Sequence, residues 1–335
     1  MNYIGSKYKL AGFIEQSMEE VVGSLHGLIM AELFGGTGII SRKLKTRLKQ
    51  LIVNDLEPYS YALLRHYIGN TTHLERQDKL IEELRQVPAH EGLIYQHYCE
   101  GSGSGRMYFS NENGQRIDGI RTQIEAWKNE GYINEPEYYF LLASLLENAD
   151  KVANTASVYG AFLKQLKRSA QNPLNLRAAA YEVVPTQQNQ VYNADANELI
   201  KQPGITGDIL YLDPPYNARQ YGANYHLLNT IVLYDVFEPR GKTGLRDYNR
   251  SLYCQSRKVA PAFEELIAQA RFRYIFVSYN NEGLMSKERV REIMSRYGHY
   301  SLKTIDYQRF KADKTENRNH KAVATKEYLH ILVKK

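Results

Sequence analysis

The sequence contains very little cysteine, with only Cys99 and Cys254 among 335 residues. Two cysteines are too few for a disulfide framework or for a cysteine-rich zinc site. No apolar run approaches the roughly 18 residues that a membrane span needs. The first residues, MNYIGSKYKLAGF, lack the apolar stretch of a secretory signal. These absences predict a reducing, cytoplasmic setting without a membrane partner.

Tryptophan is also scarce, with one residue against 27 tyrosines. Hydrophobic and charged residues make up 43% and 24% of the chain, as in soluble globular proteins. The net charge of +6 favours a polyanionic partner. Residues 151–181 hold five basic residues and no acidic ones, and residues 301–335 hold nine basic and four acidic ones. A solvated basic face is the alternative interpretation of each segment.

Strand and helix patterns alternate at the start of the chain. The stretch LIMAELFGGTG (28–38) predicts an apolar strand followed by a glycine-rich turn. Residues 39–49 predict a helix and 50–55 a second strand, which together open a parallel α/β sheet. Strand patterns resume at 190–199, near 209–213 and at 273–283, and two more strands are expected around 300–310 and 326–333.

The alternation is interrupted between residues 66 and 185, where the sequence is rich in helix patterns. We therefore expect one α/β domain made of residues 1–65 and 186–335, with 66–185 as an inserted domain. Within the insertion, GSGSGRMYFSNENGQRIDG (101–119) predicts a loop or a projecting hairpin around one short aromatic strand. Ordinary flexible linkage is the alternative for this segment.

The glycine turn FGGTGIIS nearly fits a dinucleotide fingerprint, with Gly36, Gly38 and then Ser41 in place of a third glycine. Asp55 ends the next strand, where an acid would bind a ribose hydroxyl. This pattern predicts a cofactor that contains adenosine. Glu32 directly precedes the turn, and a carboxylate there would repel a pyrophosphate. It favours S-adenosylmethionine, which carries an ammonium and a sulfonium. A strand end that faces solvent is the alternative for Glu32.

An apolar strand runs directly into two prolines in ILYLDPPYNARQY (209–221). Asp213 is an anionic hydrogen-bond acceptor, and each proline fixes φ near about −65°, which keeps the Pro214 carbonyl aimed in one direction. Two acceptors that converge on one point can bind both hydrogens of an amino group. Tyr216 offers a flat face on which the ring that carries this amine can stack. An ordinary strand end and turn is the alternative.

These motifs together resemble the DNA adenine methylase family, which is marked by Asp-Pro-Pro-Tyr. NYIGSKYKL (2–10) is similar to its N-terminal element, AELFGGTG to its cofactor loop, NDLEPYSY to its ribose-binding element and NADANEL to the element near the cofactor adenine. SYNNEG (278–283) resembles the segment that helps to build the target pocket. The resemblance assigns these residues to the cofactor: Tyr3, Lys7, Glu32, Phe34, Gly36, Asp55, Asp195 and Asp213.

The resemblance also implies the fold and the domain roles. We expect an α/β, Rossmann-like methyltransferase sheet, mostly parallel, with seven strands and a terminal antiparallel hairpin. The helix-rich insertion is expected to be a target-recognition domain. In the family, the cofactor loop often begins with aspartate where Glu32 stands here, a change that keeps the charge and adds one methylene.

The implied activity is methyl transfer from S-adenosylmethionine to the N6 amine of adenine at a specific site in duplex DNA, without a metal. The base must leave the stack, and Asp213, Pro214 and Tyr216 would then receive it as the catalytic residues. A companion restriction endonuclease, or an orphan or phage role, is left open. The expected DNA contacts are Lys164, Lys167, Arg168, Arg309 and Lys311.

Several alternatives share parts of this pattern. Methylation of adenine in RNA, or of the N4 amine of cytosine, uses the same chemistry, although the large insertion favours duplex DNA. A nicotinamide-dependent oxidoreductase fits the glycine turn but leaves the Asp-Pro-Pro-Tyr corner unexplained. A nucleic-acid-binding module without activity would have no need of Asp213.

Overall fold

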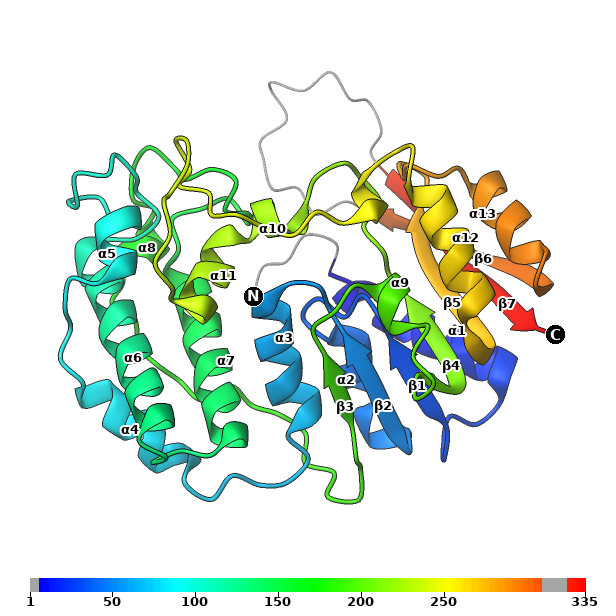
Figure 1. Cartoon of the computed structure of the whole chain (residues 1–335), viewed down its shortest axis with the longest axis horizontal. Helices are drawn as coiled ribbons and strands as arrows, with labels where there is room; N and C mark the ends of the chain where they lie inside the picture. Colours follow the sequence, from blue (N-terminus) through cyan, green and yellow to red (C-terminus); the bar gives the residue numbers. More distant parts are fainter. Residues whose placement is uncertain (1–5, 309–323) are drawn as a thin grey trace. The chain divides into compact units, whose positions relative to one another are not determined.

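The computed structural model of the 335-residue chain describes residues 6–308 and 324–335. The chain divides into two compact units. Figure 1 shows the chain coloured from its N-terminus to its C-terminus. The sheet unit comprises Lys7–Leu56, Thr186–Gln220 and Arg250–Lys335. The helical unit is built from Glu57–Pro185 and Tyr221–Asn249.

The sheet unit contains a sheet of seven strands in the order β3-β2-β1-β4-β5-β7-β6. The first five strands are parallel, and β7 is antiparallel to both β5 and β6. The strands are β1 (Ile29–Glu32), β2 (Gln50–Asn54), β3 (Gln190–Tyr192), β4 (Thr206–Leu212), β5 (Arg271–Asn280), β6 (Gly298–Gln308) and β7 (Ala324–Lys334). This confirms the predicted mostly parallel sheet with a terminal antiparallel pair.

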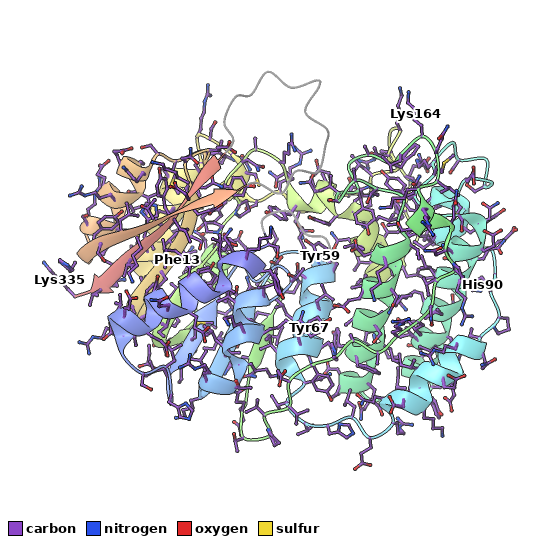
Figure 2. All side chains as sticks on the ribbon, turned by 180° about the vertical axis from the view of Figure 1, so that it is seen from behind. Phe13, Tyr59, Tyr67, His90, Lys164 and Lys335 are labelled. Carbon is purple, nitrogen blue, oxygen red and sulfur yellow. The ribbon has the colours of Figure 1, made fainter. Side chains whose placement is uncertain are left out.

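Helices cover both faces of this sheet. Buried residues of α9, α12 and α13 share one core with Ala31 and Leu33, so these helices lie on one face. The helix α1 lies on the opposite face, in front of the sheet when the molecule is seen from behind (Figure 2). The helical segments of this unit are η1 (Tyr8–Leu10), α1 (Ala11–Val22), α2 (Ile39–Leu44), η2 (Lys45–Arg47), α9 (Ala196–Leu199), η4 (Leu252–Cys254), α12 (Val259–Gln269) and α13 (Lys287–Ser295).

The order of the strands creates a switch point beside β1. The chain passes from β1 to β2 on one side of it, and β4 later pairs with its other side. In open α/β sheets, ligands bind outside the carboxyl ends of the strands at such a switch point. Residues that directly follow β1, β2 and β4 are therefore the first candidates for a site.

The helical unit is centred on the long helices α6 and α7, which contact each other. A capping box of Asn134 and Glu137 begins α7. The segments of this unit are α3 (Pro58–Leu64), the π-helical turn η3 (Arg65–Gly69), α4 (Gln77–Gln86), α5 (Leu93–Tyr98), α6 (Asn111–Asn129), α7 (Glu135–Val152), α8 (Arg168–Gln171), α10 (Tyr221–Asn224) and α11 (His226–Leu233).

The boundaries of the helical unit differ from the expected insertion at 66–185. The unit begins at Glu57 and also contains residues 221–249. The reason lies in α11, which packs on α3 and α7. Asn229 on α11 accepts a hydrogen bond from the Tyr59 backbone at 3.0 Å and donates one to the Glu57 carboxylate at 2.7 Å. The assignment of the insertion to target recognition stays a prediction.

The prediction of a loop or hairpin over residues 101–119 is wrong in its second half, because α6 begins at Asn111. Ser110 caps this helix by accepting a hydrogen bond from the Asn113 backbone. A Cβ atom at Gly114 would collide with the Cys99 sulfur, and one at Gly119 with the Pro88 carbonyl. These glycines therefore allow close packing of the helix rather than flexibility. Within the described part of the chain, no helix combines the length and apolar character needed to cross a membrane.

Candidate active site

The ends of β1 and β4 bring two predicted residues to the same edge of the sheet. Glu32, the last residue of β1, is in register with Tyr211 of β4. Asp213 directly follows β4, so it lies at the carboxyl edge beside the end of β1. Burial of the Asp213 carboxyl group raises its pKa above the usual range. The predicted corner therefore lies at the switch point of the sheet.

The glycine turn after β1 adopts backbone conformations that favour glycine. Gly36 and Gly38 have φ values of 53° and 72°, in the left-handed region. The Gly36 backbone donates a hydrogen bond to Oδ2 of Asp55 at 2.7 Å, and the Gly38 backbone donates one to the Gly35 carbonyl at 2.7 Å. Asp55 thus holds the turn in place from the end of β2. Its predicted contact with a ribose stays a prediction.

Glu32 is buried, so the alternative that it faces solvent is wrong. Its carboxyl group accepts hydrogen bonds from the Ser41 backbone, at 3.2 Å, and from the Ser41 hydroxyl. Desolvation raises the pKa of Glu32 to about 8, and the nearby charges of Asp213 and Asp55 act in the same direction. Glu32 is therefore mostly protonated at neutral pH. Ser41 occupies the third position of the glycine pattern, and sequence reasoning did not anticipate its contact with Glu32.

A buried lysine pairs with the carboxylate of the Asp-Pro-Pro-Tyr corner. Nζ of Lys7 lies 2.9 Å from Oδ1 of Asp213, and the Lys7 side chain is 7% exposed. Desolvation acts to lower the pKa of Lys7, but Asp213 and Glu327 outweigh it and the pKa is raised. The ammonium therefore stays charged, and it opposes the rise in the pKa of Asp213. Lys7 is one of the residues that the sequence assigns to the cofactor.

Glu327 is a further acid at this place that sequence reasoning missed. It lies on β7, in register with Asn280 of β5, and the Asn280 side chain hydrogen-bonds to it. Desolvation raises the pKa of Glu327, Lys7 lowers it and Asp213 raises it. The sequence signal that could have identified Glu327 is an acidic residue at the start of the otherwise mostly apolar strand pattern EYLHILV.

The two remaining residues of the corner are held by their surroundings. Pro214 is buried, and the partly buried ring of Tyr216 packs against the core of the sheet unit. The Tyr216 carbonyl accepts a hydrogen bond from the Leu284 backbone at 2.9 Å. Leu284 directly follows residues 278–283, the segment that the resemblance assigns to the target pocket. Desolvation raises the pKa of the Tyr216 hydroxyl.

Asp195 and Phe34 are linked to each other through Tyr253 and Asn197. Oδ1 of Asp195 caps α9 by accepting hydrogen bonds from the Asn197 and Glu198 backbones, at 2.8 and 3.3 Å. The Phe34 ring meets the Tyr253 ring edge-on, with centroids 4.8 Å apart. The Tyr253 hydroxyl in turn donates to the Asn197 side chain at 2.8 Å. Tyr253 was not anticipated, because it lies about 200 residues further along the chain than the glycine turn.

Asn54 fixes the ends of the strands around the turn. Its buried amide donates hydrogen bonds to the carbonyls of Leu33 and Ala194, both at 3.0 Å, and its oxygen accepts one from the Ala194 backbone. One side chain thus links the segments that follow β1 and β3. The sequence signal that could have identified Asn54 is its position, directly before Asp55 at the end of an apolar strand.

Comparison with known proteins places this site in a family. The model of the D12 class N6 adenine-specific DNA methyltransferases matches residues 3–293. The chain belongs to this family. The methyltransferase is 63% identical to Type II methyltransferase M.NlaIII of Neisseria lactamica, a match that covers 100% of this chain and 99% of the relative.

Two further relatives show the same similarity at lower identity. The methyltransferase is 35% identical to Type II methyltransferase M.CviAII of Paramecium bursaria Chlorella virus 1, over 93% of each chain. It is 39% identical to Type II methyltransferase M.FokI of Planomicrobium okeanokoites over its whole length, but spans only 53% of that protein. The chain is thus an adenine-specific DNA methyltransferase. The oxidoreductase, the RNA or cytosine methyltransferase and the inactive binding module are all wrong.

The family depends on S-adenosylmethionine, and the residues at the carboxyl edge fit this group. The negative charges of Asp213 and Asp55 raise the pKa of the Glu32 carboxyl group, and Lys7 is the cation bonded to Asp213. A ligand with an ammonium and a sulfonium would stabilise the ionised form of such a cluster. Among residues 6–308 and 324–335, no group of three or more histidine, cysteine, aspartate or glutamate side chains is arranged to hold a metal.

The predicted DNA contacts are only partly described. Lys164 is exposed and projects from the helical unit of the methyltransferase (Figure 2). Nζ of Lys167 donates to the Thr155 carbonyl at 2.7 Å, and desolvation lowers the pKa of this lysine. Arg168 begins α8 and is exposed. Tyr3, Arg309 and Lys311, to which the sequence also assigns binding roles, lie outside the described residues.

Proposed function

We propose that this methyltransferase binds both reactants at the carboxyl edge of the sheet. The cofactor side is formed by Glu32, the glycine turn, Asp55 and Asp195, and the adenine side by Asp213, Pro214 and Tyr216. The observation that carries this assignment is the position of Asp213, next to the end of β1 and bonded to a buried lysine.

The corner is suited to holding an amino group. Asp213 and the Pro214 carbonyl accept the two N–H hydrogens of adenine N6, which aims the nitrogen lone pair at the methyl group. Lys7 keeps Asp213 ionised against the cost of burial, so that the carboxylate remains an acceptor. S-adenosylmethionine, when bound, supplies the electrophilic methyl group. The contribution of the protein is positional and electrostatic.

The target amine lies within a base pair, so the adenine must leave the stack before it can reach Asp213. Tyr216 then stacks on the extruded base. The helical unit supplies phosphate and groove contacts through Lys164, Lys167 and Arg168, and Arg309 and Lys311 add contacts from the sheet unit. Phosphate contacts of this kind weaken steeply as the salt concentration rises.

The decisive experiment is to express the chain in a host without DNA methylation and to sequence the host DNA for modified adenines. We expect N6-methyladenine within one short sequence in wild-type cells. Asp213→Ala should abolish methylation while duplex binding persists. Methylation of that DNA at a wild-type level by the variant would overturn the role of Asp213.

We also propose that the methyltransferase works beside a restriction endonuclease with the same target. The three relatives above are each named as type II methyltransferases. DNA from the expressing cells should therefore resist an endonuclease that cuts at the methylated sequence. Complete cleavage of fully methylated DNA by every endonuclease with that site would contradict this role.

A further inference from the structure

A tight hairpin in the helical unit has no part in the mechanism described so far. Arg240 and Leu245 exchange two backbone hydrogen bonds, both of 2.8 Å, and form an isolated antiparallel bridge. Gly241 and Gly244 have φ values of 64° and 69°, which allow the chain to reverse direction between them. We refer to residues 240–245 as the 240–245 hairpin, and this hairpin follows α11 in the chain.

Two side chains that lie far away in the sequence bind the backbone of this hairpin. The Arg106 guanidinium donates to the Gly241 carbonyl at 3.0 Å and to the Lys242 carbonyl at 3.3 Å. The hydroxyl of buried Tyr98 donates to the Gly244 carbonyl at 2.6 Å. Because these bonds end on main-chain oxygens, they fix the position of the hairpin without engaging the side chains of its tip.

Gly244 shows how closely the hairpin is fitted to this support. A Cβ atom at this position would lie 2.8 Å from both a Tyr98 ring carbon and Nε of Arg106. Its positive φ adds backbone strain for any other residue. The hairpin is therefore a rigid projection rather than a loose connection.

The side chains at the tip are cationic. Lys242 is exposed, and among the described residues it has no ion pair. Arg240 is 67% exposed and forms a surface ion pair with Asp247, whose carboxylate orients the guanidinium through two hydrogen bonds of 2.8 and 3.1 Å. The hairpin and Lys164 project at the same end of the helical unit, opposite the end where α4 lies (Figures 1 and 2).

We propose that the 240–245 hairpin is a DNA-contacting element of this methyltransferase, with Lys242 and Arg240 directed at the phosphate backbone. This inference rests on the proposed role of the helical unit in binding DNA. It adds a segment that lies after the Asp-Pro-Pro-Tyr corner in the chain and outside the predicted insertion. A preformed basic projection suits a phosphate partner, because it loses little conformational entropy on binding.

The test compares two lysine variants of the full-length protein. Lys242→Ala should weaken binding to a duplex that contains the target site by about 3- to 10-fold, and should reduce the slope of log K against log salt by about one. Lys79→Ala is the matched control, since it removes the same charge from α4 of the same unit, where Lys79 is 64% exposed. Its affinity and salt slope should equal those of the wild type. Equal behaviour of the two variants would overturn the inference.

A second variant moves the hairpin without changing any charge. Gly244→Ala should weaken duplex binding in a protein that remains folded but melts at a lower temperature, because the added Cβ strains and displaces the tip while the helices stay packed. If Gly244→Ala unfolds, the salt slope of Lys242→Ala alone decides whether the hairpin contacts DNA. If wild-type protein methylates adenine and both hairpin variants bind like wild type, only the hairpin is excluded. If wild-type protein does not methylate DNA, the proposed function itself fails.

Discussion

Nζ of Lys7 lies 2.9 Å from Oδ1 of Asp213, which joins the segment before the first helix to the corner after β4. Both groups are largely removed from solvent, so neither is stable in its charged form without the other. In the proposed mechanism, this pair keeps the buried Asp213 carboxylate ionised, so that it can accept a hydrogen bond from the target amine. It also makes the ionisation of Asp213 depend on a residue more than 200 positions away.

Replacing Lys7 by methionine should leave Asp213 buried without a counter-charge. The pKa of Asp213, which burial already raises, should rise further. We expect methylation at neutral pH to fall on the order of 100-fold. The acidic limb of the pH profile of kcat/KM should move to higher pH, because the proposed mechanism requires Asp213 in its ionised form. Steady-state kinetics across pH 6 to 9 test this, and an unshifted acidic limb would contradict it.

Glu327→Gln should move the acidic limb of the pH profile of kcat/KM to lower pH. The charge of Asp213 raises the pKa of Glu327, so a charged Glu327 must in turn disfavour ionisation of Asp213. Removing one acid should lower the pKa of Asp213 and extend activity to lower pH. Glu327→Asp keeps the charge and should restore the wild-type profile. We expect the acidic limb to move to higher pH in Lys7→Met and to lower pH in Glu327→Gln. Shifts in the same direction would contradict an electrostatic effect of these residues on Asp213.

Glu32 should make the free protein less stable as the pH rises. Its pKa is about 8 in the folded chain and about 4.5 when unfolded. Between these values the folded state holds a proton that the unfolded state has lost, so stability falls by about 1.4 kcal/mol for each pH unit. Glu32→Gln should remove this slope. Urea unfolding at pH 6 and pH 8 measures it, with the exposed Glu198→Gln as a control that retains the slope.

His330 should have the opposite effect at acidic pH. It is buried on β7, its Nδ1 lies 2.9 Å from the Tyr300 hydroxyl, and burial lowers its pKa to about 4 from 6.5. Between these values only the unfolded state binds the proton, so stability falls as the pH falls, by about 1.4 kcal/mol per unit. His330→Gln should flatten this part of the stability curve. A variant curve parallel to that of the wild type would argue against a neutral buried imidazole.

The sequence predicted the elements whose signals are local. Apolar strands that end in Glu32, Asp55 and Asp213 mark the carboxyl edge of a parallel sheet, and the glycine turn follows the first of them. The contact between Glu32 and Ser41 was not predictable, because it depends on how Gly38 directs the following helix. Glu327 lies near enough to Asp213 to interact electrostatically because β7 pairs with β5, and strand order is a long-range property.

The helical unit was harder to predict for the same reason. Gly114 and Gly119 carry a local signal for flexibility, but they serve helix packing against residues of another segment. Likewise, the turn residues around Gly241 and Gly244 are recognisable in sequence, whereas their support by Arg106 comes from about 136 residues away. Composition and turn chemistry do not encode such contacts.

The interior position of β7 has a consequence for synthesis and assembly. It is the last strand in sequence order, yet it separates β5 from β6. Until the 11 residues of β7 have emerged from the ribosome, β5 and β6 expose unpaired edges, which favour association with other chains. A nonsense mutation just before residue 324 would therefore remove an inner strand together with Glu327, and we expect it to yield aggregates instead of a shortened enzyme.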